Sequence, residues 1–237
     1  MKVGIVCEGI TDFYAINYYV RAALQKKGFS FEFIALQPPP DNTSAGGWGN
    51  VFSWLENNPP IAREPLFGRG LLKKKKKLSR LDLILIHLDT DILPEQSFLN
   101  FLKNKNYNIE NPTNPAERGA EIAKLIAYFA NLDQCTDGIA AKHIAAPIAE
   151  SSEAWCIAVD PKFKGLAEEL SGQALIDAFG VSLARFNLKL PKETYTAINK
   201  KTKSRERYCH GTASEVARLE SCTLFVSLVE KLSAVAR

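Results

Sequence analysis

Two apolar runs in this chain end directly in acidic residues. Residues 81–88 lead into Asp89-Thr90-Asp91, and residues 3–7 lead into Glu8 and a glycine. Short continuous apolar runs are typical of strands that are covered on both faces of a parallel sheet. Because ligands bind beyond the carboxyl ends of such strands, we expect Glu8, Asp89 and Asp91 to meet at one edge of the sheet.

A third apolar run, residues 142–149, leads into two further acids. Carboxylates that crowd together repel one another, so they stay ionised only near a cation, and otherwise their pKa values rise. Oxygen ligands favour Mg²⁺ or Mn²⁺ over zinc. The sequence therefore predicts a site for Mg²⁺ or Mn²⁺ with these ligands: Glu8, Asp89, Asp91, Glu150 and Glu153.

Four of these acids also have a simpler explanation. Glu8 and Glu153 would interact favourably with the dipole of a following helix. Asp89 and Asp91 would cap the next helix. Their joint occurrence at predicted strand ends is what favours metal binding.

Two more side chains belong to the same predicted strands. His87 precedes Asp89 by two positions, so strand alternation places both on one face. It is a candidate metal ligand, although a hydrogen-bonded core histidine is the commoner role. Lys142 is a weaker candidate for stabilising phosphoryl charge, because it stands at the start of its run.

The order of the elements indicates an α/β fold. Residues 3–7 and 29–36 are predicted strands, and a segment with helical spacing lies between them. A strand, a helix and a strand in succession favour a mostly parallel, Rossmann-like sheet flanked by helices. We expect one α/β domain over residues 1–160 and a helical region over residues 161–237 that packs on it. Within the domain, the Pro- and Gly-rich residues 37–80 predict an irregular insertion with one short helix.

The composition indicates the surroundings of this domain. The chain has 237 residues, a net charge of +4 and five cysteines, which lack the spacing of a zinc site. No apolar run is long enough to span a bilayer, and the amino terminus lacks a signal-peptide pattern. We therefore expect a cytoplasmic protein without a membrane partner.

Basic residues gather in two parts of the sequence. Clusters of this kind can neutralise phosphates, although a solvated surface is the simpler explanation for a run of lysines. If both clusters contact nucleic acid, the binding residues are Lys73, Lys74, Lys75, Lys76, Lys77, Lys200, Lys201, Lys203, Arg205 and Arg207.

Short motifs in this chain resemble those of the Toprim domain. Residues 6–12, Val-Cys-Glu-Gly-Ile-Thr-Asp, are similar to its first motif, and residues 88–91, Leu-Asp-Thr-Asp, are similar to its second. Residues 147–155 are similar to a Glu-Ala-Trp stretch in small stand-alone bacterial Toprim-like proteins. The resemblance implies a Toprim fold over about the first 160 residues. It also implies the following site: Glu8 as general acid/base or metal ligand, Asp89 and Asp91 as metal ligands, and Asp12 as an accessory acid.

The resemblance extends to nucleases of the OLD family, and several such relatives are linked to phage defence or mobile elements. It implies Mg²⁺-dependent hydrolysis of phosphodiesters in nucleic acid. The chain lacks a Walker A loop, so an ATPase partner would be a separate chain. Two alternatives remain open. One is a nucleotide-sugar transferase that uses Asp-x-Asp to hold a metal on a diphosphate, and the other is a non-catalytic Toprim-like subunit that binds nucleic acid or a partner protein.

Overall fold

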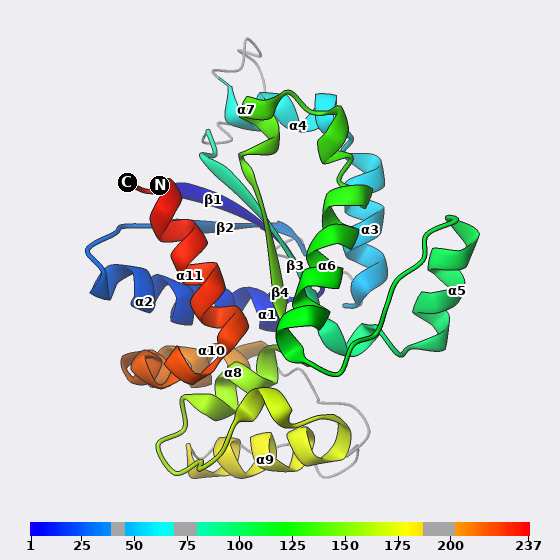
Figure 1. Ribbon diagram of the computed structural model, residues 1–237. Helices are drawn as coiled ribbons and strands as arrows, with labels where there is room; N and C mark the ends of the chain where they lie inside the picture. Colours follow the sequence, from blue (N-terminus) through cyan, green and yellow to red (C-terminus); the bar gives the residue numbers. More distant parts are fainter. Residues whose placement is uncertain (39–45, 69–79, 187–201) are drawn as a thin grey trace.

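The computed structural model describes residues 1–38, 46–68, 80–186 and 202–237. Within these ranges the strands form one parallel sheet in the order β2-β1-β3-β4 (Figure 1). The strands are β1 (Lys2–Val6), β2 (Glu32–Gln37), β3 (Leu83–Asp89) and β4 (His143–Ile148). The prediction of an α/β fold with a parallel sheet flanked by helices is therefore confirmed.

Helical segments connect the strands and follow the last one. Between β1 and β2 lie α1 (Ile10–Ala15), the π-helical turn η1 (Ile16–Val20) and α2 (Arg21–Lys26). Between β2 and β3 lie α3 (Trp48–Asn57) and α4 (Pro60–Phe67). Between β3 and β4 lie η2 (Thr90–Ile92), α5 (Gln96–Asn104), α6 (Pro115–Phe129), η3 (Leu132–Gln134) and α7 (Asp137–Ala140). After β4 come α8 (Ser152–Ala158), η4 (Ala167–Glu169), α9 (Gly172–Arg185), α10 (Thr202–Thr212), η5 (Ala213–Ser221) and α11 (Thr223–Val235).

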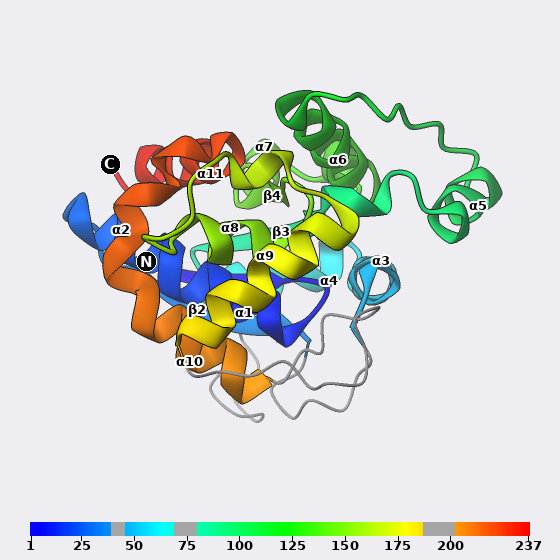
Figure 2. The same cartoon turned by 90° about the horizontal axis from the view of Figure 1, so that it is seen from below.

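Helices cover both faces of the sheet, and a separate apolar core lies on each face. The core beneath α1, α2, α8, α10 and α11 includes Leu83, Leu85 and Trp155, and Figure 2 shows these helices from below. The core beneath α3, α5 and α6 includes Ile84 and Ile86. Successive side chains of a strand point to opposite faces, so the continuous apolar run of β3 supplies both cores.

The carboxyl-terminal helices belong to the first of these cores. Tyr208 of α10 and Leu228 of α11 are buried together with Val3 and Ile5 of β1. None of the described helices is both long and apolar enough to cross a membrane.

The insertion between β2 and β3 is more regular than the sequence predicted. The expected short helix is α3, but the described part of the insertion also contains α4, which begins at Pro60. Proline suits the first position of a helix because its missing N–H would have no helical partner there. Pro59-Pro60 therefore marks the start of a helix as well as the end of α3.

Candidate metal centre

The carboxyl edge of the sheet, at the lower end of the strands in Figure 1, brings Glu8 next to Asp89. β1 and β3 are neighbours, with Val6 opposite Ile86, so the residues that follow β1 lie level with the end of β3. The Glu8 side chain accepts a hydrogen bond at Oε1 from the backbone N–H of Asp89, at 2.9 Å. Both residues are buried, at 6% exposure each.

Asp12, in the first turn of α1, completes an acidic group with two residues of β3. The ligand atoms that Asp12, His87 and Asp89 offer lie within 4.8 Å of one another, and all three residues are buried. Asp12 Oδ1 also accepts a hydrogen bond from the Ser152 hydroxyl of α8, at 2.7 Å. We refer to Glu8, Asp12, His87 and Asp89 as the acidic cluster.

His87 is held in one orientation by the neighbouring strand. Its Nδ1 lies 2.9 Å from the carbonyl oxygen of Ala146 in β4. A carbonyl oxygen can only accept, so Nδ1 carries the hydrogen and, in the neutral ring, Nε2 carries a lone pair. Nε2 lies 3.2 Å from Asp89 Oδ1, and it forms no hydrogen bond within the part of the chain that the structure describes.

The cluster shifts the ionisation of the groups within it. Burial raises the pKa of Glu8 well above its usual value, and the nearby carboxylates of Asp89 and Asp12 raise it further. Burial and the same carboxylates also raise the pKa of the Cys7 thiol. A cation among these oxygens would lower the pKa values of both Glu8 and Cys7, because its positive charge favours their ionised forms.

The cluster suits a divalent cation. Carboxylate oxygens are ligands for Mg²⁺ and Mn²⁺, and a neutral imidazole nitrogen is a ligand for transition-metal ions. A metal-bound histidine typically donates its other N–H to a carboxylate, a backbone carbonyl or water, and the Nδ1 contact with the Ala146 carbonyl has that arrangement. The residues present therefore fit the Mg²⁺ or Mn²⁺ ion that the sequence predicts.

Glu150 lies near the same edge but in a separate ion pair. It follows β4 with a φ of 54°, donates its backbone N–H to Thr90 Oγ1 at 2.8 Å, and pairs with the Arg118 guanidinium of α6. Arg118 also donates to the Thr90 carbonyl at 2.6 Å. Since a guanidinium already neutralises Glu150, we leave it out of the proposed ligands.

Glu153 is likewise paired with an arginine. It forms a buried ion pair with Arg205 of α10, and the Arg205 guanidinium also lies 3.3 Å from Ser152 Oγ and over the Phe179 ring. The prediction that Arg205 contacts nucleic acid is not supported, because its side chain is only 3% exposed. The reason is that α10 packs this side chain against α8 and α9, where it stabilises a buried carboxylate.

Asp91 is outside the acidic cluster. It lies in η2 with an exposed side chain, and its backbone N–H donates to the Glu150 carbonyl at 3.1 Å. Lys142 precedes β4, so it lies at the opposite edge of the sheet, where its Nζ is 5.1 Å from the centre of the Phe67 ring. Neither side chain is among the groups that the fold gathers around Asp89.

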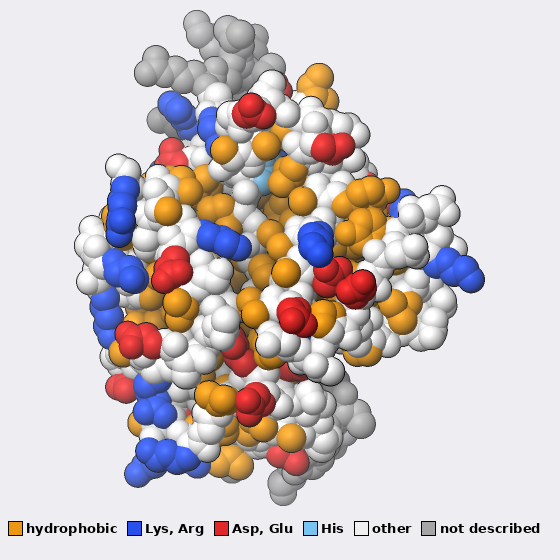
Figure 3. Space-filling view, viewed as in Figure 1, with side chains coloured by type: hydrophobic (Ala, Val, Ile, Leu, Met, Phe, Trp, Pro, Cys, Tyr) orange, Lys and Arg blue, Asp and Glu red, His pale blue; other side chains and the backbone are white. Residues whose placement is uncertain are grey.

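The remaining basic residues stay a prediction. Residues 73–77, 200 and 201 lie outside the described residues, and Lys203 and Arg207 fall within α10, where Arg207 is exposed. On the face shown in Figure 3, Lys and Arg side chains gather along the margin next to α2 and α10.

The residues of the insertion that precede α3 contact the Glu8 backbone, which the sequence did not predict. Gly47 donates its N–H to the Glu8 carbonyl at 3.0 Å, with a φ of 126° that favours glycine. A Cβ atom at Gly46 would lie 3.3 Å from the same oxygen. Trp48 anchors this segment because it donates to Glu95 Oε2 at 3.1 Å and packs on Phe98. The Gly46-Gly47 pair was the available signal, since paired glycines permit such a close approach.

The sequence did not predict the role of Ser152, whose hydroxyl donates to Asp12 Oδ1. Its available signal was the Ser151-Ser152 pair before a helix, which predicts a helix cap but not a contact with an acid. Ser152 is the first residue of α8, four positions beyond the end of β4, and its contact with Asp12 depends on how α8 packs against α1.

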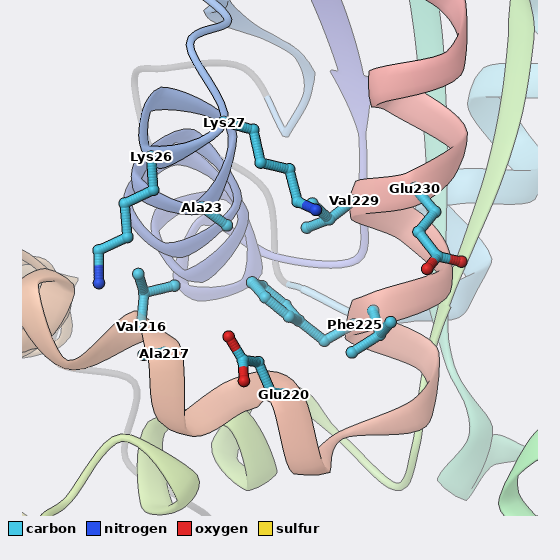
Figure 4. Close-up of a pocket in the computed structure, with 10 residues that line it drawn as sticks. Ala23, Lys26, Lys27, Val216, Ala217, Glu220, Phe225, Val229 and Glu230 are labelled. Carbon is cyan, nitrogen blue, oxygen red and sulfur yellow. The ribbon is translucent and has the colours of Figure 1, made fainter.

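A cavity of about 320 Å³ lies away from the acidic cluster, between α2, η5 and α11 (Figure 4). Ala23, Phe225 and Val229 form apolar walls, and Lys27 and Glu220 also line it. The acids at the carboxyl edge of the sheet are not among its lining residues.

Comparison with known proteins gives no relative for this chain: no protein-family model, no curated protein and no solved structure matches it.

Proposed function

We propose that this protein is a divalent-metal-dependent hydrolase of phosphodiester bonds in nucleic acid. The observation that carries the proposal is the acidic cluster, in which Asp12, His87 and Asp89 offer ligand atoms within 4.8 Å of one another at the carboxyl edge of a parallel sheet. Ligand sites of open α/β sheets lie at that edge. The resemblance of the Glu8 and Asp89 motifs to the Toprim domain supports the same chemistry.

The residues of the cluster divide into two roles. The cation is bound by Asp12, His87 and Asp89, and Glu8 acts as the general base. When bound, the cation supplies a Lewis acid that offsets phosphate charge and makes water easier to deprotonate.

Glu8 is the group best placed to accept a proton. Its Oε1 is held by the backbone N–H of Asp89, which leaves Oε2 to take the proton from the attacking water. A carboxylate with a pKa raised by burial and neighbouring acids is a stronger base than an exposed one. The pKa of Glu8 is raised in this way while no cation is bound, and a bound cation would lower it again. The position of Glu8 beside Asp89 is therefore what supports the general-base role.

Nucleic acid is the proposed substrate because the chain is basic. The net charge is +4, and the chain carries a run of five lysines. Such residues bind the phosphate backbone without reading its sequence. Phage defence and a separate ATPase partner remain proposals that rest on the Toprim resemblance alone.

The test is a cleavage assay on plasmid DNA and on a structured RNA, with Mg²⁺ or Mn²⁺ and with a chelator. We expect metal-dependent cleavage that Asp89→Asn slows at least about a hundredfold. Asp82→Asn is the matched control, because Asp82 precedes the same strand at the opposite edge and its side chain accepts the backbone N–H of Lys2 at 2.7 Å. An inert wild-type protein, or equal rates for Asp89→Asn and wild type, would overturn the proposal.

A further inference from the structure

We infer that the acidic cluster selects a first-row transition-metal ion, represented by Mn²⁺, over Mg²⁺, because His87 Nε2 is a direct ligand. This inference rests on the proposed metal site and goes beyond it by assigning the class of ion. The acids in the sequence predict either Mg²⁺ or Mn²⁺ without a preference, whereas a nitrogen ligand in the site would favour Mn²⁺.

The orientation of the His87 ring supports direct ligation. The contact between Nδ1 and the Ala146 carbonyl, at 2.9 Å, fixes the tautomer that presents a lone pair at Nε2. The ring is fully buried, so Nε2 faces the cluster instead of bulk water. A buried nitrogen that forms no hydrogen bond with the described residues is costly unless another group binds it.

The spacing of the ligand atoms fits an ion. Two adjacent ligands on an octahedral ion with bonds of about 2.1 Å lie about 3 Å apart. His87 Nε2 and Asp89 Oδ1 are 3.2 Å apart, so both could occupy adjacent positions on the same ion. Asp12 supplies a further oxygen within 4.8 Å of both.

An ion pair between a protonated His87 and Asp89 is the simpler alternative. That pair would place an N–H on Nε2 and direct it toward Oδ1. Although the two atoms are close, Nε2 does not form a hydrogen bond to Oδ1 or to any other described acceptor. The 3.2 Å contact therefore lacks hydrogen-bond geometry, and the ligand atoms that His87, Asp89 and Asp12 bring together support shared binding of one ion.

The chemistry of the donors sets the preference between ions. Mg²⁺ is bound by oxygen and retains several waters, while imidazole suits transition-metal ions. Two carboxylates with one imidazole therefore form a mixed site that Mn²⁺ occupies more readily than Mg²⁺.

The experiment titrates the full chain with Mn²⁺ and, separately, with Mg²⁺ by calorimetry, and records pulsed electron paramagnetic resonance of the Mn²⁺-loaded protein. We expect Mn²⁺ to bind at least about tenfold more tightly than Mg²⁺. We also expect a ¹⁴N coupling that shows an imidazole nitrogen bound to Mn²⁺. In His87→Gln the ¹⁴N coupling should disappear, and the preference for Mn²⁺ should fall to about threefold or less.

His143→Gln is the matched control. His143 is also a buried histidine whose Nδ1 lies 2.9 Å from a carbonyl, that of Ile139, and whose Nε2 forms no hydrogen bond with the described residues. It lies at the opposite edge of the sheet, near Arg63. The ¹⁴N coupling should persist in this variant.

Each other outcome overturns the inference. Equal affinity for the two ions, bound Mn²⁺ without ¹⁴N coupling in the wild-type protein, or no binding of either ion would do so. If His87→Gln does not fold, the wild-type coupling and the two affinities decide the matter alone. If Mg²⁺ supports cleavage but bound Mn²⁺ shows no ¹⁴N coupling, this inference is wrong and the proposed function stands. If bound Mn²⁺ shows the ¹⁴N coupling but no ion supports cleavage, the proposed function is wrong and this inference stands.

Discussion

The carboxyl edge of the sheet has two halves in which the carboxylates have different partners. Beyond β4, each glutamate lies against an arginine: Glu150 pairs with Arg118, and Glu153 pairs with Arg205. Beyond β1 and β3, the Glu8 carboxylate instead lies against a backbone N–H among other acids. Within the described residues, no lysine or arginine forms an ion pair with Glu8.

We interpret the arginine-paired acids as structural and the crowded acids as functional. An acid with its own guanidinium stabilises the fold and has little capacity left for a ligand. An acid crowded with other acids and an imidazole costs stability, and that cost is typical of sites that bind or react. The variants below test whether the two halves differ in this way.

The largest expected effect is on the arginine-paired half. Arg205→Met should lower the free energy of unfolding by about 3–5 kcal/mol, because it leaves the Glu153 carboxylate buried without its partner. Urea denaturation measures the loss. The double variant with Glu153→Leu should recover most of the stability, and a loss below about 1 kcal/mol for Arg205→Met would show that the pair is not structural.

A smaller effect concerns pH and comes from the histidine at the opposite edge. Burial lowers the pKa of His143 to about 4, from 6.5. The unfolded chain therefore takes up a proton between pH 6.5 and 4 while the folded protein does not, so this contribution to stability is complete above pH 6.5 and is lost as the pH falls. At about 1.4 kcal/mol for each pKa unit, the loss is at most about 3.5 kcal/mol.

His143→Gln isolates that contribution from the titration of the acids. In denaturation curves between pH 7 and 4, the variant should lose less stability on acidification than the wild-type protein. Parallel curves for the two proteins would show that His143 titrates normally.

Metal binding should stabilise the folded protein through the acidic half of this edge. At a Mn²⁺ concentration one hundred times the dissociation constant, the free energy of unfolding should rise by about 2.7 kcal/mol. Thermal denaturation with Mn²⁺ and with a chelator measures the rise. Asp89→Asn should abolish it and Asp82→Asn should retain it, so an equal rise in all three proteins would place the bound ion elsewhere.

The smallest effect is a gain in stability from removing one acid. Glu8→Gln keeps an oxygen for the Asp89 N–H and removes a charge that burial and neighbouring carboxylates oppose. In the presence of a chelator, the variant should be more stable than wild type by about 1 kcal/mol. A loss of stability of similar size would indicate that the Glu8 charge supports the fold.

Much of the fold could be predicted from the sequence because short apolar runs and helical spacing are local signals. The runs that end near Glu8, Asp89 and Glu150 are β1, β3 and β4, and their shared direction is what puts Glu8 beside Asp89. The second insertion helix, α4, was not predicted because Pro59-Pro60 indicates both a break and a helix start.

The charge partners could not be predicted. Arg118 is 32 positions from Glu150, and Arg205 is 52 positions from Glu153, so their pairing depends on how helices pack in three dimensions. The sequence placed all five acids in one metal site because it shows where strands end, but it does not show which guanidinium reaches which acid. Asp12 entered through the Toprim resemblance, and only the packing of α8 explains its contact with Ser152.

A crystal of the full chain grown with Mn²⁺ tests the central claim most directly. The anomalous signal of manganese locates the ion without reference to activity. We predict a single strong peak among Asp12, His87 and Asp89, with Glu8 adjacent. A peak at Glu150 or Glu153, or no peak in crystals that contain Mn²⁺ at concentrations that saturate binding in solution, would contradict the account.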